Sequence, residues 1–133
     1  MPRNDHTAFE VSNMESAIRF YTEKLGLKLV FNKIDEAGGE AYAFLELEGG
    51  NLELIQLLDE KTFIKPRLRP PYCPHLAFTT DDMSATLRML AERGVPLVAG
   101  PFEIAGAEKW VYLADPDNNV IEFIEWIAEA SEN

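Results

Sequence analysis

The sequence has a single cysteine and only two histidines among its 133 residues. Cys73 has no partner for an internal disulfide, and the first residues, Met-Pro-Arg-Asn-Asp-His, lack the apolar core of a secretory signal. No apolar run reaches the about 20 residues that a membrane helix needs. We therefore expect a chain without disulfides or membrane anchor in a reducing, cytoplasmic location.

Positive charge is also scarce. Twelve Lys and Arg residues face 23 Asp and Glu residues, which gives a net charge of −11. Like-charge repulsion opposes binding to nucleic acid or to an anionic membrane, so we expect neither as a partner. The length, with 47% hydrophobic and 26% charged residues, is typical of one globular domain. Small molecules remain as the expected ligands.

The chain contains an internal repeat. The segment from His6 to Met14 recurs 69 residues later as His75 to Met83, with His, Ala, Phe and Met at matching positions. Glu53 recurs as Glu122 at the same offset, so each glutamate follows its histidine by 47 residues. We expect two related modules, residues 5–58 and 74–127, joined by a proline-containing linker at 59–73.

Each module has the same predicted order of elements: a strand, a helix and three further strands. Alternating residues indicate the first strands, an apolar stripe at helical spacing indicates each helix, and Gly26 and Gly94 end the helices. Ser12 or Asn13 is the expected cap of the first helix, with Glu15 completing a capping box if Ser12 is the cap, and Asp81 or Asp82 caps the second. The expected strands are 6–11, 28–34, 41–47 and 51–57, and then 75–80, 96–99, 109–114 and 119–126. The fold class is therefore α+β, with two tandem βαβββ modules.

The repeated histidines and glutamates are the candidate functional residues. Strand alternation places His6 and His75 on the face opposite the phenylalanines that meet the helices. Glu53 and Glu122 stand in apolar strands, where an ionised carboxylate costs several kcal/mol unless it is paired or bound to a cation. A divalent metal held by all four residues would compensate them, and mixed nitrogen and oxygen ligands suit Ni, Zn, Co, Mn or Fe. The alternative is that the histidines are polar strand ends and the glutamates are solvated.

With these features the chain resembles the vicinal-oxygen-chelate superfamily, which includes glyoxalase I, bleomycin-resistance proteins and extradiol dioxygenases. The segments that carry the resemblance are Ala17–Gly26, Pro74–Phe78 and Leu113–Phe123. The resemblance implies that the paired βαβββ modules form a curved mixed sheet around a metal-centred cleft. It also implies a homodimer, and the cleft is built either within one chain or between two.

The ligand pattern resembles glyoxalase I most, because the His, Glu, His, Glu set of that enzyme falls on His6, Glu53, His75 and Glu122. This implies a divalent-metal-dependent lyase or isomerase that acts on a substrate with adjacent oxygens, such as the hemithioacetal of an α-oxoaldehyde and a thiol. In that chemistry the metal polarises the substrate oxygens and a glutamate moves a proton between neighbouring carbons. Glu122 and Glu53 are the candidate catalytic bases, with Glu122 favoured.

Two positions depart from the glyoxalases that use glutathione. Those enzymes place an arginine four residues after the first histidine and an asparagine four residues after the first glutamate, whereas this chain has Glu10 and Leu57 there. A carboxylate repels the glutathione carboxylate, so we expect another thiol. Glu10, Lys109 and Trp110 are further candidate substrate contacts. A metal-free drug-binding protein, like the bleomycin-resistance proteins, and a thioester epimerase of the same superfamily are the alternative functions.

Overall fold

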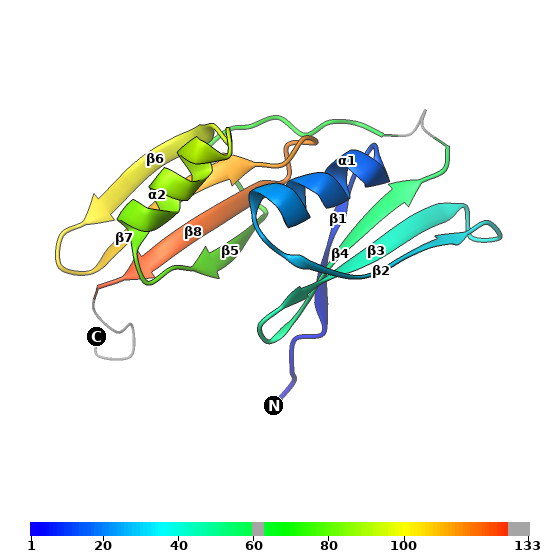
Figure 1. The fold of residues 1–133 in the computed structure, drawn as a ribbon, viewed down its shortest axis with the longest axis horizontal. Helices are drawn as coiled ribbons and strands as arrows, with labels where there is room; N and C mark the ends of the chain where they lie inside the picture. Colours follow the sequence, from blue (N-terminus) through cyan, green and yellow to red (C-terminus); the bar gives the residue numbers. More distant parts are fainter. Residues whose placement is uncertain (60–62, 128–133) are drawn as a thin grey trace. The chain divides into compact units, whose positions relative to one another are not determined.

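The computed structural model describes residues 1–59 and 63–127 of the chain. It divides into two compact units, and the chain passes from the first to the second between Pro66 and Arg67, within the expected linker. The first unit comprises Met1–Pro66 and also the short segment Asp115–Asn119, and the second comprises Arg67–Ala114 and the chain from Val120 onward. Each unit contains one four-stranded sheet (Figure 1).

The first module contains four strands and one helical segment. Its elements are β1 (His6–Glu10), α1 (Met14–Arg19), the π-helical turn η1 (Phe20–Lys24), β2 (Lys28–Asp35), β3 (Glu40–Leu47) and β4 (Gly50–Leu57). The strand order is β1-β4-β3-β2, with β1 parallel to β4 and the other neighbours antiparallel.

The second module repeats this plan. Its elements are β5 (His75–Thr79), α2 (Met83–Glu92), β6 (Leu97–Ile104), β7 (Glu108–Ala114) and β8 (Val120–Trp126). The strand order is β5-β8-β7-β6, and β5 is parallel to β8 just as β1 is parallel to β4. The predicted α+β fold with two tandem βαβββ modules is confirmed.

Each sheet has one face packed against its helix and one face without a helix. In the first module α1 packs against β3 and β4, and in the second α2 packs against β8 (Figure 1). The buried side chains under the helices include Ala43, Leu45, Leu52 and Leu54 in the first module, and Val111, Leu113 and Ile121 in the second. Strand residues that alternate with this core point to the opposite face, which we call the open face of each module.

The helices begin at repeated side-chain caps. Asn13 accepts a hydrogen bond from the backbone N–H of Ser16, and Asp82 accepts one from that of Ala85, so Asn13 caps α1 without the capping box that Ser12 would form. A second pair of acceptors comes from the last strand of each module. Gln56 Oε1 and Glu125 Oε1 each lie 2.7 Å from the N–H of the first helical residue, Met14 or Met83.

Strand β6 is longer than the sequence indicated. The sequence predicts a strand over 96–99, yet β6 continues to Ile104 through two register shifts against β7. Gly100 has a φ of 96°, and a Cβ at this position would lie 3.2 Å from the carbonyl oxygen of Trp110. Glycine therefore allows the irregular strand to stay paired with β7.

The helices that the structure describes are too short or too polar to cross a membrane.

Candidate metal and substrate site

The first module brings one histidine and one glutamate together on its open face. His6 begins β1 and Glu53 lies in the middle of the neighbouring β4, where it pairs with Ala8 on one side and Phe44 on the other. His6 Nε2 lies 3.4 Å from Glu53 Oε1. The ring of His6 also lies beside that of Phe44, with centroids 5.3 Å apart. The Glu53 side chain is 15% exposed, although it stands on the face that α1 does not cover.

The second module repeats this arrangement. His75 begins β5, and Glu122 lies in β8 opposite Ala77 and Tyr112. His75 Nε2 is 2.8 Å from Glu122 Oε1, and the His75 ring meets the edge of Tyr112 at 5.4 Å. The Glu122 side chain is 11% exposed. Each sequence-predicted pair is therefore brought into contact within its own module, at matching positions of the two sheets.

The other ring nitrogen of each histidine already has an oxygen partner. His75 Nδ1 lies 3.0 Å from the carbonyl oxygen of Tyr72, and His6 Nδ1 lies 2.6 Å from Asp5 Oδ2. A carbonyl and an ionised carboxylate only accept hydrogen bonds, so both Nδ1 atoms carry a proton. A neutral imidazole then presents a bare lone pair from Nε2 to the glutamate oxygen. That contact is favourable only with a second proton on the ring or a cation between the two atoms.

This donor set fits a divalent metal in its chemistry. Neutral imidazole Nε2 and carboxylate oxygen are ligands of zinc and its first-row neighbours, and each Nδ1–H is held by an outer partner, as ligating histidines commonly are. Over residues 1–59 and 63–127, no group of three or more His, Cys, Asp and Glu side chains is arranged to hold a metal ion. One module supplies one pair of ligands, so a four-ligand site needs both pairs.

The local charges shift two pKa values at these pairs. The hydrogen bond to Asp5 raises the pKa of His6, with burial opposing it and the charge of Glu53 adding to it. Burial raises the pKa of Tyr112, and the negative charge of Glu122 raises it further. Tyr112 therefore remains a neutral phenol beside Glu122 at neutral pH.

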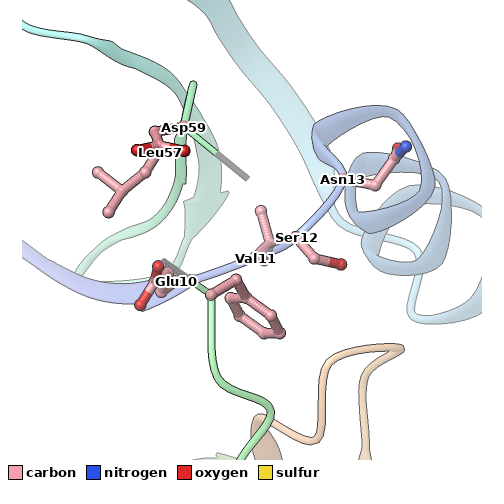
Figure 2. A pocket seen from close by; sticks show the side chains of 7 residues that line it. Glu10, Val11, Ser12, Asn13, Leu57 and Asp59 are labelled. Atoms are coloured by element: carbon pink, nitrogen blue, oxygen red, sulfur yellow. The ribbon is translucent and has the colours of Figure 1, made fainter. Parts of the chain in front are cut away.

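A cavity of about 390 Å³ opens in the first module where β1 ends (Figure 2). Glu10 and Leu57, the two positions that depart from the glutathione-using enzymes, both line it. The described lining residues are Glu10, Val11, Ser12, Asn13, Leu57, Asp59 and Phe63. Among these described residues the charged groups are the carboxylates of Glu10 and Asp59, and none is an arginine or a lysine.

The other two candidate substrate residues, Lys109 and Trp110, lie on opposite faces of the second module. Trp110 pairs with Ile124 and stands two residues from Tyr112, so it shares the open face with Glu122. Its ring lies 5.5 Å from that of Phe102. Lys109 alternates with Trp110 and therefore points to the face that α2 covers, away from Glu122.

Comparison with known proteins decides the family. Residues 3–123 match the Glyoxalase/Bleomycin resistance protein/Dioxygenase superfamily. The chain belongs to this superfamily. The matched region contains both His–Glu pairs and the cavity, so the whole candidate site lies within the superfamily fold.

Two relatives and one further structure show how this superfamily member compares with others. Virulence protein STM3117 of Salmonella typhimurium is 30% identical over 94% of this chain and 85% of its own length, and its crystal structure matches with a TM-score of 0.69. A lactoylglutathione lyase of Neisseria meningitidis serogroup A is 31% identical over 90% of this chain and 88% of its own. A trypanothione-dependent glyoxalase I of Leishmania major shares the fold, with a TM-score of 0.73 at 22% identity over 94% of this chain and 87% of its own.

The superfamily member also has site-supporting residues that the sequence analysis missed. Asp5 and the Tyr72 carbonyl hold the two histidine rings, and Gln56 and Glu125 hold the helix starts. The 69-residue repeat could have revealed Gln56 and Glu125, because they match each other at that offset. No such signal exists for Asp5, whose counterpart in the repeat is Pro74.

Proposed function

We propose that the chain is a divalent-metal-dependent enzyme of glyoxalase I type, with His6, Glu53, His75 and Glu122 as its metal ligands. One observation carries this proposal. In both modules a histidine has its Nδ1 proton held by an outer oxygen while its Nε2 faces a largely shielded glutamate. A metal site built from two related halves requires this recurrence, and the low exposure of both glutamates, 15% and 11%, favours such a site over two solvated ion pairs.

The proposed reaction is the isomerisation of a small substrate with adjacent oxygens, such as an α-oxoaldehyde–thiol hemithioacetal. A bound divalent metal supplies Lewis-acid stabilisation of negative charge that develops on the substrate oxygens. Glu122 takes the proton from one carbon and returns it to the neighbouring carbon, and Glu53 is the second candidate for this role. Both carboxylates are withdrawn from water, which favours proton transfer to carbon over proton loss to solvent.

The thiol of this substrate is proposed to be one other than glutathione. The cavity at the end of β1 presents the carboxylates of Glu10 and Asp59 and the apolar side chains of Leu57 and Phe63. An anionic glutamyl group would meet like charge from Glu10, and it would find no hydrogen-bond donor on Leu57. A neutral or amine-bearing thiol meets neither obstacle.

A complete site is proposed to form by combining one pair from each module, within one chain or between two chains of a homodimer. Two ligands from one module leave a divalent metal short of the three or four protein ligands that zinc-type sites use. Loss of either pair is therefore expected to weaken metal binding as severely as loss of the other.

The test combines metal analysis with an activity panel. Purified protein is expected to contain about one divalent ion per four-ligand site, and to turn over methylglyoxal mixed with one of several thiols. Glu122→Gln and Glu53→Gln are expected to lower kcat by at least 100-fold. Glu46→Gln, which removes an exposed carboxylate from the same sheet as Glu53, serves as the control and is expected to retain activity.

The other outcomes separate the alternatives. Protein that binds no Ni, Zn, Co or Mn and remains inactive after their addition would overturn the proposal. Ligand binding that persists after chelation of metal would indicate a drug-binding protein. Isotope exchange at the α-carbon of a thioester, without hemithioacetal turnover, would indicate an epimerase.

A further inference from the structure

We propose that Asp5 is a positioning residue of the metal site, which holds the His6 ring so that Nε2 is presented as a ligand beside Glu53. This inference rests on the proposed metal site and assigns a role to a residue outside the ligand set. Asp5 directly precedes β1, and its Oδ2 lies 2.6 Å from His6 Nδ1. The distance is that of a short, charge-assisted hydrogen bond.

The two histidine rings differ in how far the surrounding protein restricts their rotation. The His75 side chain is 21% exposed, whereas that of His6 is 40% exposed and lies at the free end of the first strand. An exposed ring at a strand end rotates easily about its side-chain torsions, and each alternative rotamer removes Nε2 from Glu53. His6 is therefore the ligand that most needs an external partner.

The repeat shows why that partner is a side chain in the first module. In the second module the backbone carbonyl of Tyr72 accepts from His75 Nδ1 at 3.0 Å. The residue that matches Asp5 in the repeat is Pro74, which has no side-chain acceptor. The two modules thus fix the same nitrogen by unrelated means, a carboxylate in one and a carbonyl in the other.

The contacts of His6 with Phe44 and Glu53 restrict its ring in other ways than the hydrogen bond to Asp5 does. The Phe44 ring lies on one side of the imidazole, with centroids 5.3 Å apart and an angle of 42° between the planes. Glu53 approaches from the Nε2 side at 3.4 Å. Phe44 limits the tilt of the ring, but its apolar surface cannot distinguish Nδ1 from Nε2. Among these contacts, Asp5 is the one that selects the tautomer with the proton on Nδ1.

The test measures metal affinity and the histidine tautomer separately. Zinc or nickel affinity is measured by competition with a chelating dye for the wild type, Asp5→Asn and Asp5→Ala, with Asp81→Asn as a control that loses the same charge from an exposed position in the second unit. Loss of an outer carboxylate on a ligating histidine typically weakens metal binding by about 10- to 100-fold. Because the Asp5 side chain is 85% exposed, Asp5→Ala is expected at the lower end of this range, about tenfold. Asp5→Asn is expected below that end, and Asp81→Asn within twofold of the wild type.

Nitrogen-15 NMR of the metal-free protein gives the second readout. Neutral His6 is expected to carry its proton on Nδ1 in the wild type and to lose this preference in Asp5→Ala, while His75 keeps it in both proteins. A wild type that binds metal together with Asp5 variants of unchanged affinity overturns this inference alone. A wild type that binds no metal overturns both the inference and the proposed function.

Discussion

The hydrogen bond between Tyr21 and Asp115 is expected to be among the strongest single contributions to the stability of the first unit. Tyr21 is fully buried, and its hydroxyl donates to Asp115 Oδ2 at 2.8 Å. The other Asp115 oxygen accepts from the backbone N–H groups of Asp117 and Asn119, and Asn119 Nδ2 also donates to Oδ2. Tyr21→Phe removes one of four donors to a buried carboxylate.

The expected loss follows from that geometry. A buried hydrogen bond to a charged group contributes about 1.5–3 kcal/mol, so Tyr21→Phe is expected to lower the free energy of unfolding by about 2 kcal/mol at neutral pH. Urea denaturation followed by circular dichroism measures this loss. Tyr42→Phe is the matched control, because Tyr42 belongs to the same unit but stands on the open face of its sheet and is only partly buried.

The loss is also expected to depend on pH. Burial raises the pKa of Asp115 above its ordinary value of 3.8, and hydrogen bonds from Asn119 and Tyr21 oppose that rise. The folded chain thus binds this proton more tightly than the unfolded chain, so the stability that Asp115 contributes is full below 3.8 and is lost as pH rises through the folded pKa. Removing the Tyr21 donor raises that pKa further, so the difference between variant and wild type grows toward neutral pH. A loss below about 0.5 kcal/mol, or one that is equal near pH 3.8 and at neutral pH, would refute this reasoning.

Three further predictions concern the cavity, the caps and β6. Glu10→Arg combined with Leu57→Asn is expected to raise kcat/KM for a glutathione hemithioacetal by about tenfold or more, since each new charged hydrogen bond is worth about 1.5–3 kcal/mol. Steady-state kinetics measures this change, and the control is Glu10→Gln, which removes only the repulsion. In denaturant unfolding, Gln56→Ala is expected to lower the free energy of unfolding by about 1 kcal/mol and Glu125→Ala by about 2 kcal/mol, because Glu125 places a charge at a helix N-terminus. Equal losses in the two variants would contradict the charge argument. Gly100→Ala is expected to lower the free energy of unfolding by more than about 1 kcal/mol, because an alanine there has both a strained φ and a close contact with backbone. An unchanged melting temperature would show that β6 relaxes around the alanine.

The sequence was informative wherever the structure depends on periodicity. The 69-residue repeat identified both modules, and parallel pairing of the first and last strands brings each histidine beside its own glutamate. Both pairs therefore could be predicted from spacing and strand alternation. Contacts made by a single loop leave no repeat or alternation in the sequence, so they could not be predicted in this way. Ser12, a candidate cap by residue type, instead donates its backbone N–H and hydroxyl to Asp117.

Two other features depend on the strand register, which local composition does not show. Gly100-Pro101 is a strong breaker signal, but β6 tolerates it because register shifts take up the irregularity. Lys109 is a candidate substrate contact because it precedes a strand beside the segment 104–108, and strand alternation in the structure points it to the face that α2 covers. Charge and proximity in sequence say little about which face of a strand a side chain occupies until the register is fixed.

The first unit is not one continuous piece of chain. Asp115–Asn119 comes from the connection between β7 and β8 but belongs to the first unit, where Asp115 accepts from Tyr21 and Asn119 donates to the carbonyl of Glu10. A gene cut after Pro66 would thus give a fragment that keeps Tyr21 and lacks its buried acceptor. Either half expressed alone would therefore lack hydrogen bonds that the first unit has in the whole chain. Five residues of the second repeat have become part of the first.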